Sequence, residues 1–174
     1  MEENMSAYSE QELAAAAHLG EVLKQKGWLL GTAESCTGGL LAGAITSVSG
    51  SSEWFDRGFV TYTNESKVEE LDVNTAALEK FGAVSEQVAI EMAEGVLNKV
   101  LTATCAISTT GIAGPTGATE GKPVGMVCFA VAYRKLEGIV TLPFTKHFDG
   151  NRTQVRQAAV LFALEAASKI LLEN

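Results

Sequence analysis

Hydrophobic and polar positions along the chain alternate between a helical period and short strand-like runs. A first helix is expected to begin at the capping box Ser9-Glu10-Gln11-Glu12 and to stop at Gly27. Its apolar face recurs every three or four residues, at Leu13, Ala16, Ala17 and Leu23. The short apolar run at 28–33 then predicts a buried strand.

The rest of the chain repeats this alternation. Further helices are expected at 40–45, after a cap at Asn64, after a cap at Ser85, and from Asp149-Gly150-Asn151-Arg152 onward. Further strands are expected at 59–62, 103–109, 124–132 and 139–146, the last at a sheet edge because it contains Pro143. Alternation of this kind predicts an α/β fold, a three-layer α/β/α sandwich with a central mixed sheet. The strand order stays open.

Length and composition fit one folded domain spanning residues 1–174. Hydrophobic residues make up 47% of the chain and charged residues 20%, which is typical of a compact globule and not of a disordered segment. The sequence contains neither an internal repeat nor a linker. It is long enough to bury a core without disulfide bonds.

Charge and hydropathy argue against nucleic-acid and membrane partners. The formal net charge is −8 and the Lys and Arg residues are scattered, so we expect no nucleic-acid partner, although a local pocket for a small anion remains compatible. No apolar run approaches the roughly 18–20 residues that a membrane span needs. The N-terminal residues lack the pattern of a signal peptide. We therefore expect a cytoplasmic protein without a membrane partner.

Cysteine and histidine usage argues against a metal site. The three cysteines lack metal-ligand spacing, and Cys105 and Cys128 lie inside apolar runs, where they are expected to be core residues. Neither a His-x-His nor a His-Glu-x-x-His motif occurs. We predict no metal and no cofactor.

Small and hydroxylic residues collect where predicted strands end, which is where open α/β sheets place their ligand sites. The segments are 32–39, 108–117 and, less distinctly, 49–52. In the first, Ser35 lies in a turn between a strand and a helix whose N-terminus favours an oxyanion or a phosphate. The same pattern also fits a simple helix cap, with Ser35 or Thr37 satisfying free N–H groups.

A serine nucleophile needs a base. Only two histidines occur, His18 and His147, and both are expected at the surface. Lys67 is an alternative base, because burial and a helix N-terminus would lower its pKa, and Tyr62 would relay the proton. The competing interpretation is that Lys67 pairs with Glu70 or Glu34 at the surface. Cys36 is a further nucleophile candidate, since a helix N-terminus favours a thiolate.

Two other features have both a binding and a structural interpretation. The glycines of 111–117 match neither the dinucleotide-binding pattern nor a Walker A loop, so this loop either holds a ligand or only turns the chain. Arg152 and Arg156 are one helical turn apart and either clamp an anion or face solvent. Solvent exposure is the stronger interpretation for Arg156.

Seven blocks, taken together and in order, resemble a known family. They are Thr32-Ala33-Glu34-Ser35-Cys36-Thr37-Gly38-Gly39, Gly50-Ser51-Ser52-Glu53-Trp54-Phe55, Tyr62-Thr63-Asn64-Glu65-Ser66-Lys67, Gly82-Ala83-Val84-Ser85, Thr110-Gly111-Ile112-Ala113-Gly114-Pro115, Lys122-Pro123-Val124-Gly125 and Gly150-Asn151-Arg152. The chain thereby resembles the bacterial nicotinamide-nucleotide amidohydrolases, or NMN deamidases, which are homologous to the C-terminal domain of CinA competence/damage-inducible proteins. The resemblance covers roughly residues 10–172.

This resemblance implies hydrolysis of the carboxamide of nicotinamide mononucleotide (NMN) to nicotinate mononucleotide and ammonia, in NAD recycling, by a metal-free serine–lysine dyad. Ser35 then becomes the nucleophile and Lys67 the base, Tyr62 assists, and Ser52 is a reserve nucleophile. Backbone N–H groups around 36–38 or 110–111 are candidate oxyanion donors. The implied substrate-binding residues are Thr37, Gly38, Ser52, Thr110, Gly111, Gly114 and Arg152.

Two departures from the family pattern touch these expectations. The turn after Pro115 is longer than usual, and Asn151 stands where an aspartate is common, which removes a carboxylate that would orient Arg152. The separate N-terminal domain of full CinA proteins is missing, so no pyrophosphatase activity is expected. The resemblance also favours a homo-oligomer. The alternative function is a non-catalytic module that binds a phosphorylated small molecule or nucleotide.

Overall fold

The computed structural model describes residues 6–174 and confirms an alternating α/β chain. Within these residues it has six α-helices, five strands and one short 3₁₀ helix. In chain order they are α1 (Glu10–Lys26), β1 (Leu30–Glu34), α2 (Leu40–Thr46), the 3₁₀ helix (Ser51–Glu53), β2 (Phe55–Val60), α3 (Asn64–Leu71), α4 (Thr75–Phe81), α5 (Glu86–Lys99), β3 (Cys105–Gly111), β4 (Met126–Lys135), β5 (Gly138–His147) and α6 (Arg152–Glu173).

The five strands form one mixed sheet in the order β2-β1-β3-β4-β5. The β1 strand runs parallel to both β2 and β3, whereas β4 is antiparallel to β3 and β5. The mixed sheet is therefore confirmed, and the strand containing Pro143 lies at an edge, as expected. Because β1, β2 and β3 run the same way, their carboxyl ends meet at one edge of the sheet.

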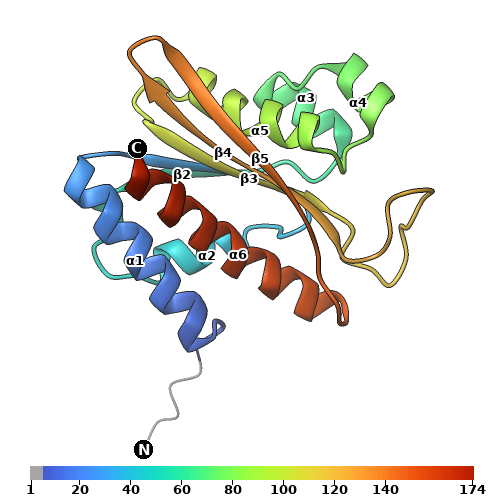
Figure 1. The fold of residues 1–174 in the computed structure, drawn as a ribbon, viewed down its shortest axis with the longest axis horizontal. Coiled ribbons are helices and arrows are strands. Elements are labelled where there is room, and N and C mark those ends of the chain that lie inside the picture. The colour runs from blue at the N-terminus through green and yellow to red at the C-terminus, as the bar shows by residue number, and fades with distance from the viewer. Residues whose placement is uncertain (1–5) are drawn as a thin grey trace, which may run out of the picture.

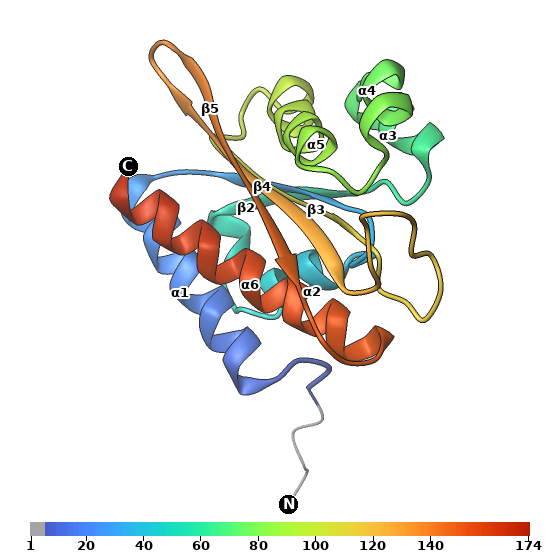
Figure 2. The ribbon, with the colours of Figure 1, turned by 45° about the vertical axis from the view of Figure 1, so that its right-hand side comes forward.

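Helices cover both faces of the sheet (Figure 1), which confirms the three-layer sandwich. The turned view in Figure 2 shows α1, α2 and α6 on one face and α3, α4 and α5 on the other. Side chains of β4 alternate between the two layers. Val127, Phe129 and Val131 belong to the core under α1 and α6, while Cys128 and two alanines belong to the core under α5. Such alternation is what a strand buried on both faces requires.

Most helix ends follow their expected signals. Ser9 forms a capping box with Glu12, Gly27 ends α1 in the left-handed conformation, and Ser85 caps α5. The cap of α3 differs from expectation, because the Thr63 side chain accepts from the Ser66 N–H and Asn64 is the first helical residue.

Some strand boundaries also differ from expectation, and one helix was not expected. The second strand spans Phe55–Val60 instead of 59–62, because it pairs with β1 along its whole length and its polar residues face solvent at the sheet edge. The β3 strand continues to Gly111, so Thr110 belongs to a strand and not to the loop. The short helix α4 has no counterpart among the expected elements.

Candidate active site

Ser35 lies immediately after β1, at the edge where the carboxyl ends of the parallel strands meet. Its N–H donates to the Thr109 carbonyl at 2.9 Å, which extends the pairing of β1 with β3 by one residue. The residue is 8% exposed. The backbone of Ser35 is thus fixed by the sheet, while its hydroxyl lies just beyond the sheet edge.

Lys67 points from α3 directly at this hydroxyl. Its side chain is completely buried, and its Nζ lies 3.0 Å from Ser35 Oγ, 2.8 Å from the Thr61 carbonyl oxygen and 3.2 Å from the Tyr62 carbonyl oxygen. No ion pair involving Lys67 is present among residues 6–174. The interpretation of Lys67 as a surface partner of Glu70 or Glu34 is therefore wrong.

Burial prepares Lys67 to act as a base. Loss of solvation lowers the pKa of Lys67 from 10.5 to about 8, because the buried site penalises the ammonium form. A neutral amine has two N–H groups and one lone pair. In the structure Lys67 Nζ donates to the Thr61 and Tyr62 carbonyls and to Ser35 Oγ. Once the amine is neutral, the two carbonyls can accept its two N–H groups, and its lone pair is then available to the hydrogen of Ser35 Oγ.

Tyr62 contributes to this cluster through its backbone and not through its phenol. The Tyr62 side chain is 59% exposed, and its hydroxyl accepts a hydrogen bond from Arg152 Nη2 at 3.2 Å. The carbonyl of the same residue contacts Lys67 Nζ and, at 3.4 Å, accepts from Ser35 Oγ. The structure does not place the phenol between Ser35 and Lys67, contrary to the expected proton relay.

The other candidate nucleophile and bases are less suitable. Cys36 is buried, and burial together with the nearby Glu34 charge raises the pKa of its thiol to about 12, so the thiol stays protonated at neutral pH. His18 and His147 are both exposed, as expected, and neither borders the cavity at Ser35.

A cavity of about 350 Å³ opens at Ser35 and Lys67. Four of the expected binding residues line it: Thr110, Gly111, Gly114 and Arg152. Its remaining apolar and small wall residues are Ile112, Ala113, Thr116 and Gly117, which belong to the expected ligand segment 108–117, and Ala83 and Val84, to which no binding role was assigned from the sequence. Ala83 and Val84 belong to one of the seven blocks that carry the family resemblance, and that membership could have indicated a place in the site.

Arg152 stands at the rim of this cavity, in the first turn of α6. Its Nη1 donates to the Gly114 carbonyl at 2.8 Å, and its Nη2 donates to the Tyr62 hydroxyl. These two contacts orient the guanidinium without a carboxylate. Asn151 instead caps α6, because its side chain accepts from the Gln154 N–H at 3.0 Å.

Three residues expected to bind substrate lie outside the cavity lining. Thr37 is completely buried, with its hydroxyl 2.6 Å from Glu34 Oε1 and 2.7 Å from Thr109 Oγ1, so it supports the turn from beneath. Gly38 takes a positive φ of 56° in that turn.

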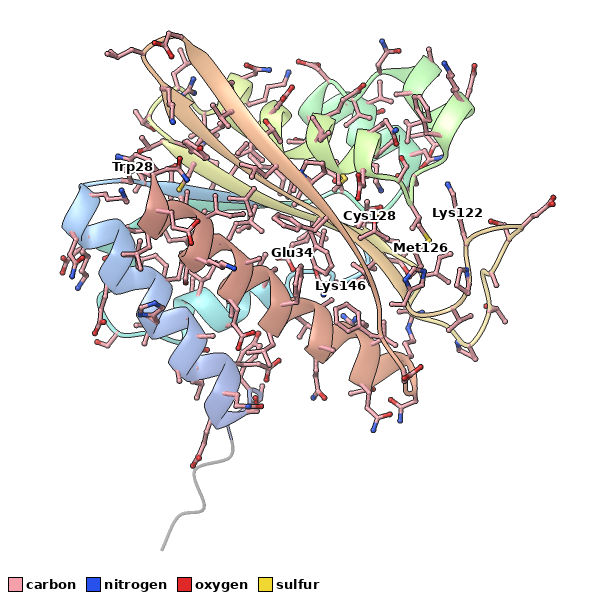
Figure 3. The ribbon with its side chains drawn as sticks, in the orientation of Figure 1. Trp28, Glu34, Lys122, Met126, Cys128 and Lys146 are labelled. Carbon is pink, nitrogen blue, oxygen red and sulfur yellow. The ribbon has the colours of Figure 1, made fainter. Side chains whose placement is uncertain are left out.

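Ser52 is exposed in the 3₁₀ helix before β2. This helix lies where β1 and β2 begin, whereas Ser35 lies where β1 ends, so the two serines are at opposite ends of these strands. In Figure 3, Trp28 marks that far end, while Lys122 and Met126 lie near the loop beside the cavity. Within one chain Ser52 cannot serve as the reserve nucleophile of this cavity.

Glu34 is a functional position that the sequence analysis missed. Its carboxylate is completely buried and accepts from the N–H groups of Leu41 at 2.8 Å and Ala42 at 3.1 Å. These N–H groups form the start of α2, which was expected to bind an anion. Glu34 already occupies that place, so the substrate must find its donors elsewhere.

Suitable oxyanion donors remain beside Ser35. The N–H groups of Cys36 and Thr37 donate to no backbone carbonyl within residues 6–174, whereas the Gly38 N–H is used by the Ser35 carbonyl at 3.0 Å. In β3, Ile112 N–H donates to Met126 on β4, so the preceding N–H of Gly111 faces the other way. It faces the space beyond Glu34, where the pairing with β1 has ended.

Two further structural findings bear on metal and membrane chemistry. Within residues 6–174, His, Cys, Asp and Glu side chains nowhere gather in threes in a way that would hold a metal ion. None of the helices described is long and apolar enough to cross a membrane.

Comparisons with known proteins identify the family of this chain. The family described as the CinA C-terminal domain matches residues 12–171. The chain is 50% identical to nicotinamide-nucleotide amidohydrolase PncC of Enterobacter agglomerans over 159 residues, which are 91% of this chain and 94% of that protein. It is 51% identical over 152 residues to a putative competence-damage inducible protein of Caldicellulosiruptor saccharolyticus, covering 87% of this chain and 36% of that protein.

A solved structure shares the whole architecture. The crystal structure of the competence/damage inducible protein CihA from Agrobacterium tumefaciens superimposes with a TM-score of 0.87 at 43% identity, covering 98% of this chain and all of that one. The resemblance drawn from the seven sequence blocks is therefore confirmed at the level of the family and of the fold.

Proposed function

Because the chain belongs to the CinA C-terminal domain family, we propose that it is a nicotinamide-nucleotide amidohydrolase acting through Ser35 and Lys67. It hydrolyses the carboxamide of NMN to nicotinate mononucleotide and ammonia. The observation that carries the proposal is the 3.0 Å contact between the buried Lys67 amine and the Ser35 hydroxyl at the floor of a cavity. Relatives named for this activity match nearly the full chain.

In the first half of the reaction, the neutral Lys67 amine takes the proton of the Ser35 hydroxyl. The Ser35 oxygen attacks the carboxamide carbon, and the electron pair of the C=O bond moves to the oxygen. We assign this oxyanion to the N–H groups of Cys36, Thr37 and Gly111, which donate to no backbone carbonyl among residues 6–174. One such donor is often worth about 3–4 kcal/mol of transition-state stabilisation.

The C–N bond then breaks as the Lys67 ammonium returns its proton to the departing nitrogen, which leaves as ammonia. The nicotinoyl group remains on Ser35 as an ester. Lys67, neutral again, takes a proton from water, and the hydroxide attacks the ester carbon. Release of nicotinate mononucleotide returns the proton to Ser35 Oγ. Every proton passes through one amine, which fits the lowered pKa of Lys67.

Arg152 is suited to hold the 5′-phosphate or the ribose. Among residues 6–174, it is the one cation besides Lys67 that lines the cavity, and two of its N–H groups are engaged with groups of that part of the chain. The remaining N–H groups of the Arg152 guanidinium can therefore donate to phosphate oxygens. Thr110 donates its hydroxyl to the Ala83 carbonyl at 2.9 Å and forms part of the cavity wall.

A non-catalytic module that binds a phosphorylated small molecule is the second candidate. The glycine-lined cavity and Arg152 favour it. Lys67 weighs against it, because a buried amine without a carboxylate partner is costly and a binding module gains nothing from pointing it at a serine.

The deciding experiment measures both binding and chemistry. Purified protein is incubated with NMN in the presence of a chelator, and ammonia and nicotinate mononucleotide are quantified. Their equimolar release supports the amidohydrolase and a reaction without metal or cofactor. Saturable NMN binding by calorimetry without ammonia release would support the binding module instead. We place the activity in NAD recycling in the cytoplasm and expect a homo-oligomer, which light scattering tests.

A further inference from the structure

Arg156 contacts the Ser35 turn from behind. One helical turn after Arg152 on α6, its Nε donates to the Cys36 carbonyl at 3.1 Å and its Nη2 donates to the Thr37 carbonyl at 3.2 Å. The side chain is half-buried and borders no part of the cavity at Ser35. The expectation that Arg156 faces solvent is therefore wrong, and the contact needs another explanation.

The two carbonyls belong to the turn that holds the unpaired N–H groups. In a trans peptide the carbonyl of one residue and the N–H of the next share a rigid plane and point in opposite directions. Fixing the Cys36 carbonyl consequently fixes the direction of the Thr37 N–H. The Ser35 carbonyl, held by Gly38 N–H at 3.0 Å, fixes the Cys36 N–H in the same way.

The turn is clamped from both sides of its backbone. Beneath it, Glu34 and Thr109 hold the Thr37 hydroxyl at 2.6 and 2.7 Å, and Arg156 holds the carbonyls from α6. Gly38 permits this approach, since a Cβ there would lie 3.3 Å from Arg156 Nη2.

The guanidinium of Arg156 interacts with these carbonyls and not with a carboxylate. It is absent from the ion pairs found among residues 6–174. Hydrogen bonds from a charged donor are stronger than neutral ones, and they polarise the peptide groups that accept them. A polarised peptide is a better N–H donor to an oxyanion, and a fixed one needs no reorganisation during the reaction.

We propose that Arg156 is a positioning residue for the oxyanion-binding turn: by holding the Cys36 carbonyl it aims the Thr37 N–H at the reacting carboxamide, and by holding the Thr37 carbonyl, together with the Leu40 N–H at 2.9 Å, it fixes the rest of the turn. The proposal rests on the amidohydrolase function for its kinetic consequence. Arg156 does not touch the substrate, so its contribution falls on turnover and not on substrate binding.

The kinetic test compares Arg156→Met and Arg156→Lys with Gln157→Met, an exposed neighbour on the same helix. We expect the kcat of Arg156→Met for NMN to fall by about tenfold or more, with KM within about twofold, because transition-state stabilisation alone is lost. Arg156→Lys keeps the charge without the fork and should recover part of the kcat. Added guanidinium, but not urea, should raise the kcat of Arg156→Ala.

A second measurement reads the turn without using activity. Hydrogen exchange by mass spectrometry should show faster exchange in peptides covering 34–40 in Arg156→Met, with peptides of α5 and the melting temperature nearly unchanged. An unchanged exchange rate in 34–40 overturns the proposal whether or not the protein is active. Unchanged kcat in an active protein, or a KM effect alone, overturns it as well. An inactive wild-type protein with faster exchange in Arg156→Met instead refutes the proposed function alone.

Discussion

Two serine-containing segments lie at opposite ends of the same pair of strands, and only one of them has the surroundings of a catalytic site. Ser35 follows β1 and Ser52 precedes β2, and the intervening strand of five residues separates them by roughly 16 Å. Ser35 is nearly buried, faces a buried amine and borders a cavity. Ser52 is exposed on a 3₁₀ helix and is absent from that cavity.

The difference lies in what each end of the sheet contributes. At the carboxyl ends of β1 and β3, backbone groups beyond the last ladder bond stay free, and α3 brings a lysine into that space. At the other end, the strand starts are closed by bonds between neighbouring segments, such as the one from Leu30 N–H to the Trp54 carbonyl at 2.8 Å, which joins β1 to the residue before β2. A hydroxyl in a small-residue segment is thus not enough; a desolvated base beside it makes the site.

Among the substitutions at the Ser35 end of the strands, removing the Lys67 amine should reduce turnover the most. Lys67→Met keeps the apolar stem but removes the base, so we expect kcat for NMN to fall by more than about a hundredfold. Ammonia release measures it, and circular dichroism checks that the variant is folded. Retained turnover in folded Lys67→Met would mean that another group deprotonates Ser35.

Arg152→Met should show a different signature from that of Lys67→Met. Because the arginine is expected to hold phosphate or ribose at the rim, KM for NMN should rise by about tenfold or more while kcat changes less. Arg152→Lys is the matched variant that retains the charge. A loss confined to kcat in Arg152→Met would place this residue in the chemistry instead.

The pH dependence of turnover tests whether burial of Lys67 makes it a base near neutral pH. The pKa of Lys67 is lowered to about 8, so the amine is mostly protonated at pH 7 and mostly neutral at pH 9. Since the neutral form is the base, kcat/KM should rise about tenfold between pH 7 and pH 9. Initial rates across this range measure it. A rate that is flat, or that falls as the pH rises through 8, contradicts Lys67 as the base.

Tyr62→Phe should have the smallest effect among these changes. The backbone carbonyl that contacts Lys67 is retained, and only the hydroxyl that accepts from Arg152 is lost. We expect kcat to stay within about fivefold of the wild type, with a modest rise in KM. A loss of kcat as large as that of Lys67→Met would instead support a proton relay through the Tyr62 phenol.

The fold was largely predictable because its signals are local. Capping residues and the left-handed glycine after α1 mark helix ends wherever the rest of the chain lies. The failure at β2 has a physical cause as well. Asp56 and Arg57 pair with each other at an exposed edge, so the apolar pattern disappears although the strand still pairs with β1.

The site was predictable only in part. Ser35 and Lys67 came together through the family resemblance, since residue spacing alone favoured a helix cap for Ser35 and a surface ion pair for Lys67. The roles of Glu34 and Arg156, and the support that the Thr37 side chain gives to the turn, were missed because they depend on contacts that the sequence pattern does not show. The contact of Arg156 with Cys36, for example, spans 120 positions.

The most direct test of the central claim measures ammonia release from NMN by Ser35→Ala and Ser52→Ala side by side, with chelator present and folding verified. We predict a loss of more than about a hundredfold in Ser35→Ala and a rate within about twofold of the wild type in Ser52→Ala. Near wild-type turnover by folded Ser35→Ala would contradict it. A large loss in Ser52→Ala would show that the far end of the sheet contributes to catalysis, in the cavity of a second copy of the chain.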